Sequence, residues 1–308
     1  MSIDPLSNAA FPIPRVVTDV TKRNPLGSAI TRAGMILATD GVDILTGKWQ
    51  GLDISQQPQH KMCEVLNISI CGPMPDDRAS LLEDVKPNVP WAENHFRERV
   101  FGQPLNPGNE FRNWPFFRGN VPKHQTEPGF KFSHTYMERF WPKEAGLNLT
   151  DKDKFDRDHQ GTAFTRAGIR YSYGDLQDVI NHLAKDPLSR QAFLPVWFPE
   201  DTGVVHGGRV PCTLGYHFIR RADRLHCVYY IRSCDYFRHL RDDVYMAVRL
   251  VQHVLDKLDE HDKVAKSQDW VGVQPGTLTM HITSLHCWAS ERKLLPSISR
   301  EAYDGGRS

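Results

Sequence analysis

Residues 209–243 constrain the fold of this chain more than any other stretch. Within them, 214–220 and 225–232 alternate apolar with polar side chains, contain several aromatic residues, and are separated only by 221–224. Alternation with a period of two is typical of β-strands, and a short polar connection joins strands that run antiparallel. The stretch therefore predicts a β-hairpin.

Two other stretches repeat their apolar residues at helical spacing. Over 244–258 the apolar positions follow a period of about 3.6 residues, which predicts a long helix with Asp242 or Asp243 as its N-cap. Residues 174–185 show the same spacing and predict a shorter amphipathic helix that ends before Pro187.

The rest of the chain predicts shorter elements and more irregular segments. Residues 1–25 are interrupted by proline and are expected to form an irregular arm, and 102–165 is expected to be a loop-rich insertion. No internal repeat and no linker divides the chain, so we expect a single α+β domain over residues 1–308. The remaining expected elements are a short helix over 90–99 and strands over 64–70, 192–198 and 278–286.

The composition is that of an ordinary globular protein, with 40% hydrophobic and 24% charged residues. A formal net charge of +1 gives no sign of polymeric nucleic acid as a partner. No apolar run approaches the roughly 18 residues of a membrane helix, and the N-terminus lacks a signal-peptide pattern. The six cysteines include no CxxC pair, which favours reduced thiols. We therefore expect a cytoplasmic protein without a metal site.

The candidate nucleophile is Cys212, which follows Pro211 immediately before the predicted hairpin. A cysteine acts as a nucleophile in its thiolate form, and nearby arginines can lower its pKa. The alternative is a small buried hydrophobic residue, which is the commoner role of a cysteine. Arg232 and Ser233 end the second predicted strand, and Arg190 lies between the amphipathic helix and the next strand. Guanidinium and hydroxyl donors of this kind suit a phosphate group, although surface ion pairs explain them equally well.

In this order the motifs resemble the thymidylate synthase superfamily over about 120 residues. The resemblance implies a large mixed β-sheet with flanking helices, one sheet face used for dimerisation, and 5,10-methylenetetrahydrofolate as co-substrate. The elements that carry it are Tyr173-Gly174, Asp186-Pro-Leu-Ser-Arg190, Trp197, Pro211-Cys212, Arg232-Ser-Cys-Asp235, Asp243 and His286-x-Trp288.

The resemblance implies that the substrate is a nucleoside monophosphate. Cys212 would add to C6 of the pyrimidine ring, and Arg232 and Ser233 would hold the 5′-phosphate. Arg190 would reach the phosphate site of the other subunit in a homodimer.

The same resemblance assigns roles around the sugar and the base. His286 and Trp288 would lie by the sugar hydroxyl, where the alternative is that both fill the core. Tyr173 would organise the water that takes the C5 proton, and Asp235 would contact the base or its surroundings.

The N-terminal half matches the superfamily poorly, so its assignments rest on single residues. The catalytic glutamate expected on an early helix is assigned to Glu93, with Glu98 in reserve. Arg23 is assigned as the phosphate-binding arginine near the N-terminus.

Asp243 replaces the asparagine with which the synthases read uracil. An amide both donates and accepts hydrogen bonds, whereas an ionised carboxylate only accepts them. Cytosine offers an N4 amino donor and an N3 that must carry a proton, so Asp243 favours dCMP. This pattern resembles the deoxycytidylate hydroxymethylases of bacteriophages, whose second nucleophile is water. The alternatives are C5 methylation of dUMP or dCMP, hydroxymethylation of dUMP or CMP, and nucleotide binding without catalysis.

Overall fold

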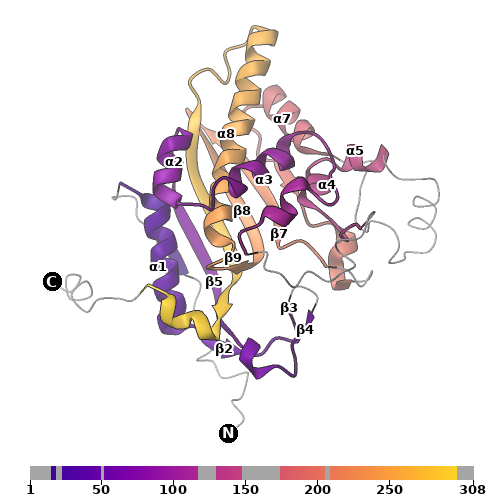
Figure 1. Ribbon diagram of the computed structural model, residues 1–308. Helices are drawn as coiled ribbons and strands as arrows, with labels where there is room; N and C mark the ends of the chain where they lie inside the picture. The colour runs from indigo at the N-terminus through magenta and orange to yellow at the C-terminus, as the bar shows by residue number, and fades with distance from the viewer. Residues whose placement is uncertain are drawn as a thin grey trace, which may run out of the picture.

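The computed structural model describes residues 15–18, 23–49, 52–116, 130–147, 174–204 and 209–296. Within these residues, seven strands form one mixed sheet in the order β1-β5-β9-β8-β7-β6, and β2 pairs with β5 (Figure 1). The strands are β1 Arg15–Thr18, β2 Val42–Ile44, β5 Met62–Pro73, β6 Phe193–Pro195, β7 Thr213–Arg221, β8 Arg224–Asp235 and β9 Gln274–Trp288. A separate pair consists of β3 Lys48–Trp49 and β4 Leu52–Asp53.

Helices lie along the sheet in front of it in the view of Figure 1, with α8 crossing its centre. The helices are α1 Pro25–Asp40, α2 Arg78–Val85, α3 Trp91–Val100, α4 Tyr136–Phe140, α5 Pro142–Leu147, α7 Leu176–Lys185 and α8 Leu240–Ala265. Short 3-10 turns are η1 Pro58–His60, η2 Asn109–Asn113, η4 Pro199–Val204 and η5 Ala289–Leu294. This large mixed sheet with flanking helices confirms the predicted fold class.

The predicted hairpin is confirmed as β7 and β8, which pair antiparallel with Tyr216 opposite Tyr229. The turn between them uses Ala222 with φ of 50°, in the left-handed region. β9 then pairs parallel to β8, and the chain crosses between them through α8. Parallel neighbours require such a crossover, so the predicted long helix follows directly from the sheet topology.

α8 begins earlier than the sequence predicts, and its N-cap is His239 rather than Asp242 or Asp243. The cause is Asp235, whose Oδ1 accepts hydrogen bonds from the backbone N–H of Phe237 and of Arg238, both at 3.0 Å. This turn starts the helix one turn upstream. The two aspartates therefore lie inside the first turn of α8.

Asp242 bonds elsewhere. Its carboxylate accepts the backbone N–H of Asn88 at 2.7 Å and the side-chain amide of the same residue at 2.9 Å. The bond ties the first turn of α8 to the segment that precedes α3.

The N-terminal region is more regular than expected. Residues 15–18, placed by the sequence in an irregular arm, form β1 and pair parallel with β5. α1 was not predicted, because glycine, threonine and serine interrupt its apolar pattern. Glycine is required at position 34 of this helix, because a Cβ there would collide with the Tyr236 ring. The other departures from the predictions are α4, α5 and η2 inside the 102–165 segment, β6 with only three residues, and β5 and β9, which are longer than expected.

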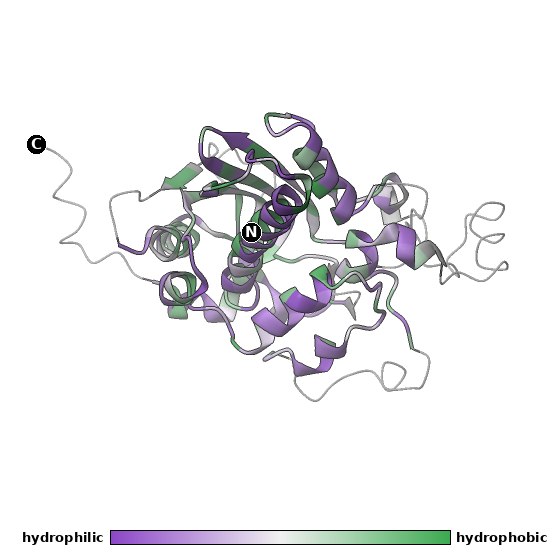
Figure 2. Cartoon of the chain, turned by 90° about the horizontal axis from the view of Figure 1, so that it is seen from above, coloured by the Kyte–Doolittle hydropathy of each residue, from purple (hydrophilic) through white to green (hydrophobic). Residues whose placement is uncertain are grey.

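The core lies between the sheet and the helices. In Figure 2 both the strands and the helices carry green and purple residues, because each element buries one side and exposes the other. The side chains of Tyr216, Phe218 and Tyr229 are at most 2% exposed. Neighbouring strand positions such as His217 and Tyr230 point to the other face and stay half-exposed. The two sheet faces thus differ, because the helices of the described ranges cover only one of them.

No helix in the described ranges is both long and apolar enough to cross a membrane.

Candidate active site

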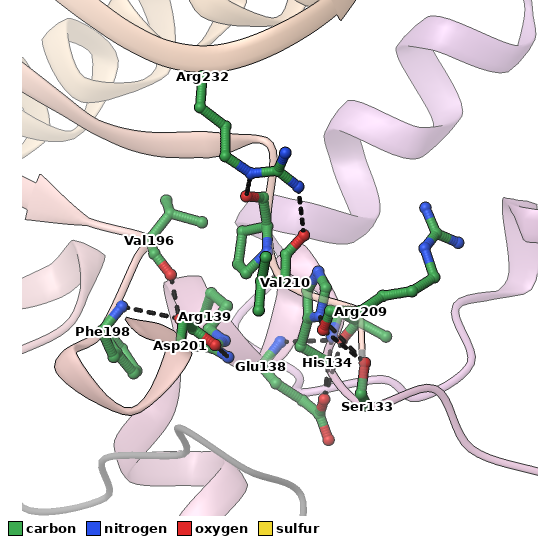
Figure 3. Close-up of polar contacts among 12 residues, drawn as sticks. Ser133, His134, Glu138, Arg139, Val196, Phe198, Asp201, Arg209, Val210 and Arg232 are labelled. Atoms are coloured by element: carbon green, nitrogen blue, oxygen red, sulfur yellow. Dashed lines mark hydrogen bonds and ion pairs between the residues drawn. The ribbon is translucent and has the colours of Figure 1, made fainter. Parts of the chain in front are cut away.

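The loop before β7 presents Cys212 and is held in place by Arg232 of β8. The Arg232 Nε donates to the Pro211 carbonyl at 2.8 Å, and its Nη2 donates to the Val210 carbonyl at 3.1 Å (Figure 3). The same Nη2 lies 3.9 Å from the Cys212 Sγ. The backbone N–H of Arg232 also donates to the Cys212 carbonyl at 2.9 Å. One guanidinium therefore fixes the loop and places a positive charge beside the thiol.

The other side of this loop is held by the segment before α4. The Ser133 hydroxyl and the His134 Nδ1 both donate to the carbonyl of Arg209, at 2.8 and 2.9 Å (Figure 3). The loop that carries Cys212 is thus fixed from two elements that lie far apart in the sequence.

The pKa of Cys212 is raised, not lowered as the sequence predicts. Burial is the largest cause, and the negative charge of Asp243 adds to it. Arg232 and Arg209 oppose both effects but do not outweigh the loss of solvent. At neutral pH the free protein therefore holds Cys212 as a thiol.

Asp243 lies in the first turn of α8, half-buried, and shares the electrostatic environment of Cys212. Burial raises the pKa of Asp243 to about 7, the charge of Arg99 lowers it, and Asp242 raises it. The Cys234 thiol donates to its Oδ2 at 3.7 Å. A carboxyl group with this pKa takes up and releases a proton at neutral pH.

Sequence reasoning missed Tyr136 and Arg99, which lie beside these two residues. The Tyr136 hydroxyl accepts from the backbone N–H of Thr213 at 3.5 Å and from its hydroxyl at 3.4 Å. Burial raises the pKa of Tyr136, and the nearby Cys212 raises it further. Arg99 stacks on the Tyr136 ring, with Cζ 4.2 Å from the ring centroid. No local pattern marks either residue, because α3 and α4 reach the site only through the tertiary fold.

The expected phosphate-binding residues do not all meet within one chain. Ser233 follows Arg232 on β8 and is half-buried opposite Ser284 of β9. Arg190 is exposed, its carbonyl accepts a bond from His217, and its guanidinium makes no hydrogen bond to the described residues.

Asp235 and His286 lie opposite each other in the parallel register of β8 and β9. The Asp235 carboxylate is occupied by the turn before α8 and by the Arg238 guanidinium at 3.0 Å, so it organises backbone near the site. Burial lowers the pKa of His286, which keeps the imidazole neutral, although Asp235 opposes this shift. Trp288 ends β9 and packs against the His60 ring, with centroids 5.3 Å apart.

Glu93 lies in an ion-pair cluster rather than beside Cys212. Its oxygens accept from Arg97 at 2.9 Å, from the Tyr245 hydroxyl at 2.7 Å and from Arg249 at 3.1 Å. Burial raises its pKa, but these hydrogen bonds outweigh that effect, so the pKa is lowered. Tyr245 stands two positions after Asp243 on α8, about 200° around the helix. The contacts of Glu93 therefore do not support the water-orienting role expected of it.

The remaining sequence assignments are separated from the site or fall outside the described residues. Glu98 accepts the backbone N–H of Glu110 at 2.9 Å and bonds His95. Arg23 pairs with Glu83 at 3.0 Å, and both side chains are exposed. Tyr173 lies outside the described residues.

A pocket of about 450 Å³ opens between α7 and β6, next to the site. Aromatic side chains of Phe193, Trp197 and Phe198 line it, together with His182 and Asp178. Trp197 connects it to the Cys212 loop, because its ring lies 5.9 Å from the Arg232 Cζ. The described residues contain no group of three or more His, Cys, Asp or Glu that could hold a metal ion.

Part of the chain matches a known protein family. Residues 153–301 match the family described as thymidylate synthase, and no curated protein matches the chain. The matched range contains Cys212, Arg232, Asp243 and His286, which the structure places around the start of β7 and of α8. Over this range, which is just under half of the chain, the protein is similar to the thymidylate synthase family.

Proposed function

We propose that this protein transfers a hydroxymethyl group to C5 of dCMP. The reaction converts dCMP, 5,10-methylenetetrahydrofolate and water to 5-hydroxymethyl-dCMP and tetrahydrofolate. The observation that carries the proposal is Asp243, a carboxyl group with a pKa near neutrality in the environment of the Cys212 thiol. Such a group can donate a proton to N3 of cytosine and accept a hydrogen bond from its N4 amino group.

The covalent step begins at Cys212. Its thiolate attacks C6, the electrons of the C5–C6 double bond shift toward C4, and N3 receives the proton of Asp243. Arg232 stabilises the thiolate from 3.9 Å, and it holds the loop so that the sulfur does not turn away. The resulting enamine has a nucleophilic C5.

The bound folate supplies a one-carbon unit at the oxidation level of formaldehyde. A planar heteroaromatic ring fits the aromatic lining of the pocket beside Trp197, and this supports the pocket as its binding region. Loss of the C5 proton and of tetrahydrofolate would leave an exocyclic methylene at C5. Water would add to that carbon, and departure of the Cys212 thiolate from C6 would restore the C5–C6 double bond.

The nucleotide phosphate is assigned to Arg232, Ser233 and, from a second subunit, Arg190. The half-exposed sheet face that carries His217 and Tyr230 supports a homodimer, because no helix within the described ranges covers it. His286 and Trp288 are assigned to the sugar.

Mass spectrometry of the product tests the proposal. The protein is incubated with methylenetetrahydrofolate and, separately, with dCMP, dUMP or CMP. We expect dCMP to gain one CH2O unit, and Cys212→Ala to abolish turnover while leaving nucleotide binding largely intact. A gain of one CH2 unit, together with dihydrofolate formation, would establish methylation instead. A fully active Cys212→Ala protein would exclude the covalent mechanism.

Base preference is tested by Asp243→Asn. An amide at this position pairs with uracil, so we expect turnover to move from dCMP toward dUMP. An unchanged preference would remove the basis for assigning cytosine.

A further inference from the structure

Arg99 of α3 is a buried arginine whose guanidinium makes no hydrogen bond to the residues that the structure describes. The residue is 5% exposed, and its Nε is buried without a partner. Its backbone is fixed, because the Arg99 carbonyl accepts the Trp141 indole N–H at 2.8 Å. Buried guanidinium groups are normally paired, since removal of an isolated charge from water is unfavourable. The position of Arg99 therefore calls for a functional explanation.

The surroundings of Arg99 are those of the Cys212 site. Its guanidinium stacks on Tyr136, whose hydroxyl bonds Thr213, the residue that follows Cys212. α3 packs against α8, which carries Asp243 in its first turn. Of the charges that act on Asp243, Arg99 is the one that most favours its ionised form.

We propose that Arg99 is a positioning residue of this site. Its buried guanidinium is the counter-charge that stabilises the Asp243 carboxylate when Asp243 exchanges a proton with N3 of the pyrimidine. The inference rests on the proposed function, because it assumes that Asp243 faces the N3 edge of the base. It adds a residue on a different helix, outside the range that matches the synthase family.

The proton balance explains why a counter-charge is needed. When the thiolate bonds to C6, the O–H bond of Asp243 breaks, an N3–H bond forms, and Asp243 becomes a carboxylate. When C5 forms its bond to the one-carbon unit, the electron pair returns, and the N3 proton goes back to Asp243. Without a nearby cation, a buried carboxylate is too unfavourable to form in the first step. Arg99 stabilises that carboxylate without giving up a hydrogen bond of its own.

Other ionisable groups around Asp243 also affect its pKa. Among them, Arg99 is the charge that lowers this pKa most. Asp242 disfavours its ionisation, and the Cys234 thiol favours it through one long hydrogen bond. The groups that interact with Asp243 from the elements packed around it are Arg99 on α3, Asp242 on α8, Tyr136 on α4, Cys212 and Tyr216 at β7, and Tyr229 and Cys234 on β8.

The test measures dCMP binding as a function of pH in a Cys212→Ser background, which removes the titration of the thiol. Calorimetric dissociation constants are taken between about pH 6.5 and 9, above the second pKa of the phosphate. Above the pKa of Asp243, its carboxylate would face the N3 lone pair of the base, and the two would repel each other. The affinity for dCMP therefore falls above this pKa, by about tenfold per pH unit. Adding Arg99→Met moves the midpoint to higher pH. If the midpoint moves by about one pH unit, the variant with Arg99→Met retains at pH 8 a fraction of its low-pH affinity about fivefold larger than that retained by the Cys212→Ser protein alone.

Two matched variants separate charge from shape. Arg99→Lys keeps the charge and retains the parental midpoint, whereas Asp243→Asn removes the pH dependence in this range. Arg99→Gln replaces Arg99→Met if circular dichroism shows that the latter does not fold.

An Arg99→Met or Arg99→Gln protein with the parental midpoint would overturn the inference, as would an equal loss of affinity at every pH. Failure of the proposed function has a different signature: the Cys212→Ser protein does not bind dCMP, and the unaltered protein forms no product from it.

Discussion

The buried pair of Arg139 and Asp201 makes a sharp prediction about stability. The two side chains are 1% and 0% exposed, and two parallel hydrogen bonds of 2.9 Å join them (Figure 3). The Asp201 carboxylate also accepts the backbone N–H of Phe198 at 2.9 Å. The pair therefore fixes the segment after β6, which carries Trp197 next to Arg232.

Removal of one partner leaves the other charge buried without its counter-charge. For such a change we expect a loss of about 3–5 kcal/mol in the free energy of unfolding. Asp201→Ala additionally leaves the Phe198 N–H unpaired, which adds about 1–3 kcal/mol. Because small domains are stable by only about 5–15 kcal/mol, each single variant loses a large part of its stability.

Urea unfolding, followed by circular dichroism, measures these values in a double-mutant cycle. Arg139→Met together with Asp201→Ala leaves no unpaired charge, so we expect it to be less destabilising than the sum of the two single changes by at least about 2 kcal/mol. The matched control is the exposed pair of Lys257 and Glu260, 2.8 Å apart, where Lys257→Ala changes stability by less than about 0.5 kcal/mol. Additive effects at Arg139 and Asp201, or single effects as small as the control, would refute the argument.

Two further predictions concern carboxyl groups. The folded-state pKa of Asp243, about 7, lies above the ordinary value of 3.8, so the folded protein binds more protons than the unfolded chain between these pH values. The contribution of Asp243 to stability is therefore lost as pH rises from about 4 to 7. Over this range we expect the free energy of unfolding of Asp243→Asn, relative to that of the unaltered protein, to rise by up to about 4 kcal/mol, as measured from unfolding curves. Glu93→Gln weakens the cluster with Arg97 and Arg249 and lowers the melting temperature, while the kcat for C5 transfer stays within a few-fold of that of the unaltered protein. A large loss of kcat at unchanged stability would instead give Glu93 the catalytic role that its sequence position suggested.

The elements predicted correctly are those whose signal is local. The β7–β8 hairpin and α7 have regular periods and a defined turn or cap, and in α7 Asp175 and Asp178 form a reciprocal capping box. α1 escaped prediction because Gly34 is required by a distant contact with Tyr236 and breaks the pattern that would identify a helix. The periodicity of a sequence indicates which face of a helix or strand is buried, but not which other element packs against that face.

The residues of the candidate site also divide into those with a local sequence signal and those without one. The sequence predicts Cys212 and Arg232 as neighbours because they flank one hairpin, and the structure brings them within 3.9 Å. Tyr136 and Arg99 were missed because they come from helices that reach the site across the fold. Glu93 was chosen from its helix and its charge, but long-range partners on α8 use that carboxylate for an ion-pair cluster.

The raised pKa values of Cys212 and Asp243 have a joint consequence for reactivity. Each group disfavours ionisation because it is buried, and the charge of Asp243 disfavours the thiolate of Cys212. The site therefore prefers to hold one negative charge rather than two, so the two groups titrate as a coupled pair. Of the two forms with one charge, the form with a thiolate and a neutral Asp243 has the nucleophile and the N3 proton donor that the proposed addition to C6 requires. Arg232 stabilises the charge at the sulfur, and Arg99 stabilises it at the carboxylate. In the proposed mechanism, addition to the ring moves the negative charge from Cys212, next to Arg232, to Asp243, whose carboxylate Arg99 stabilises.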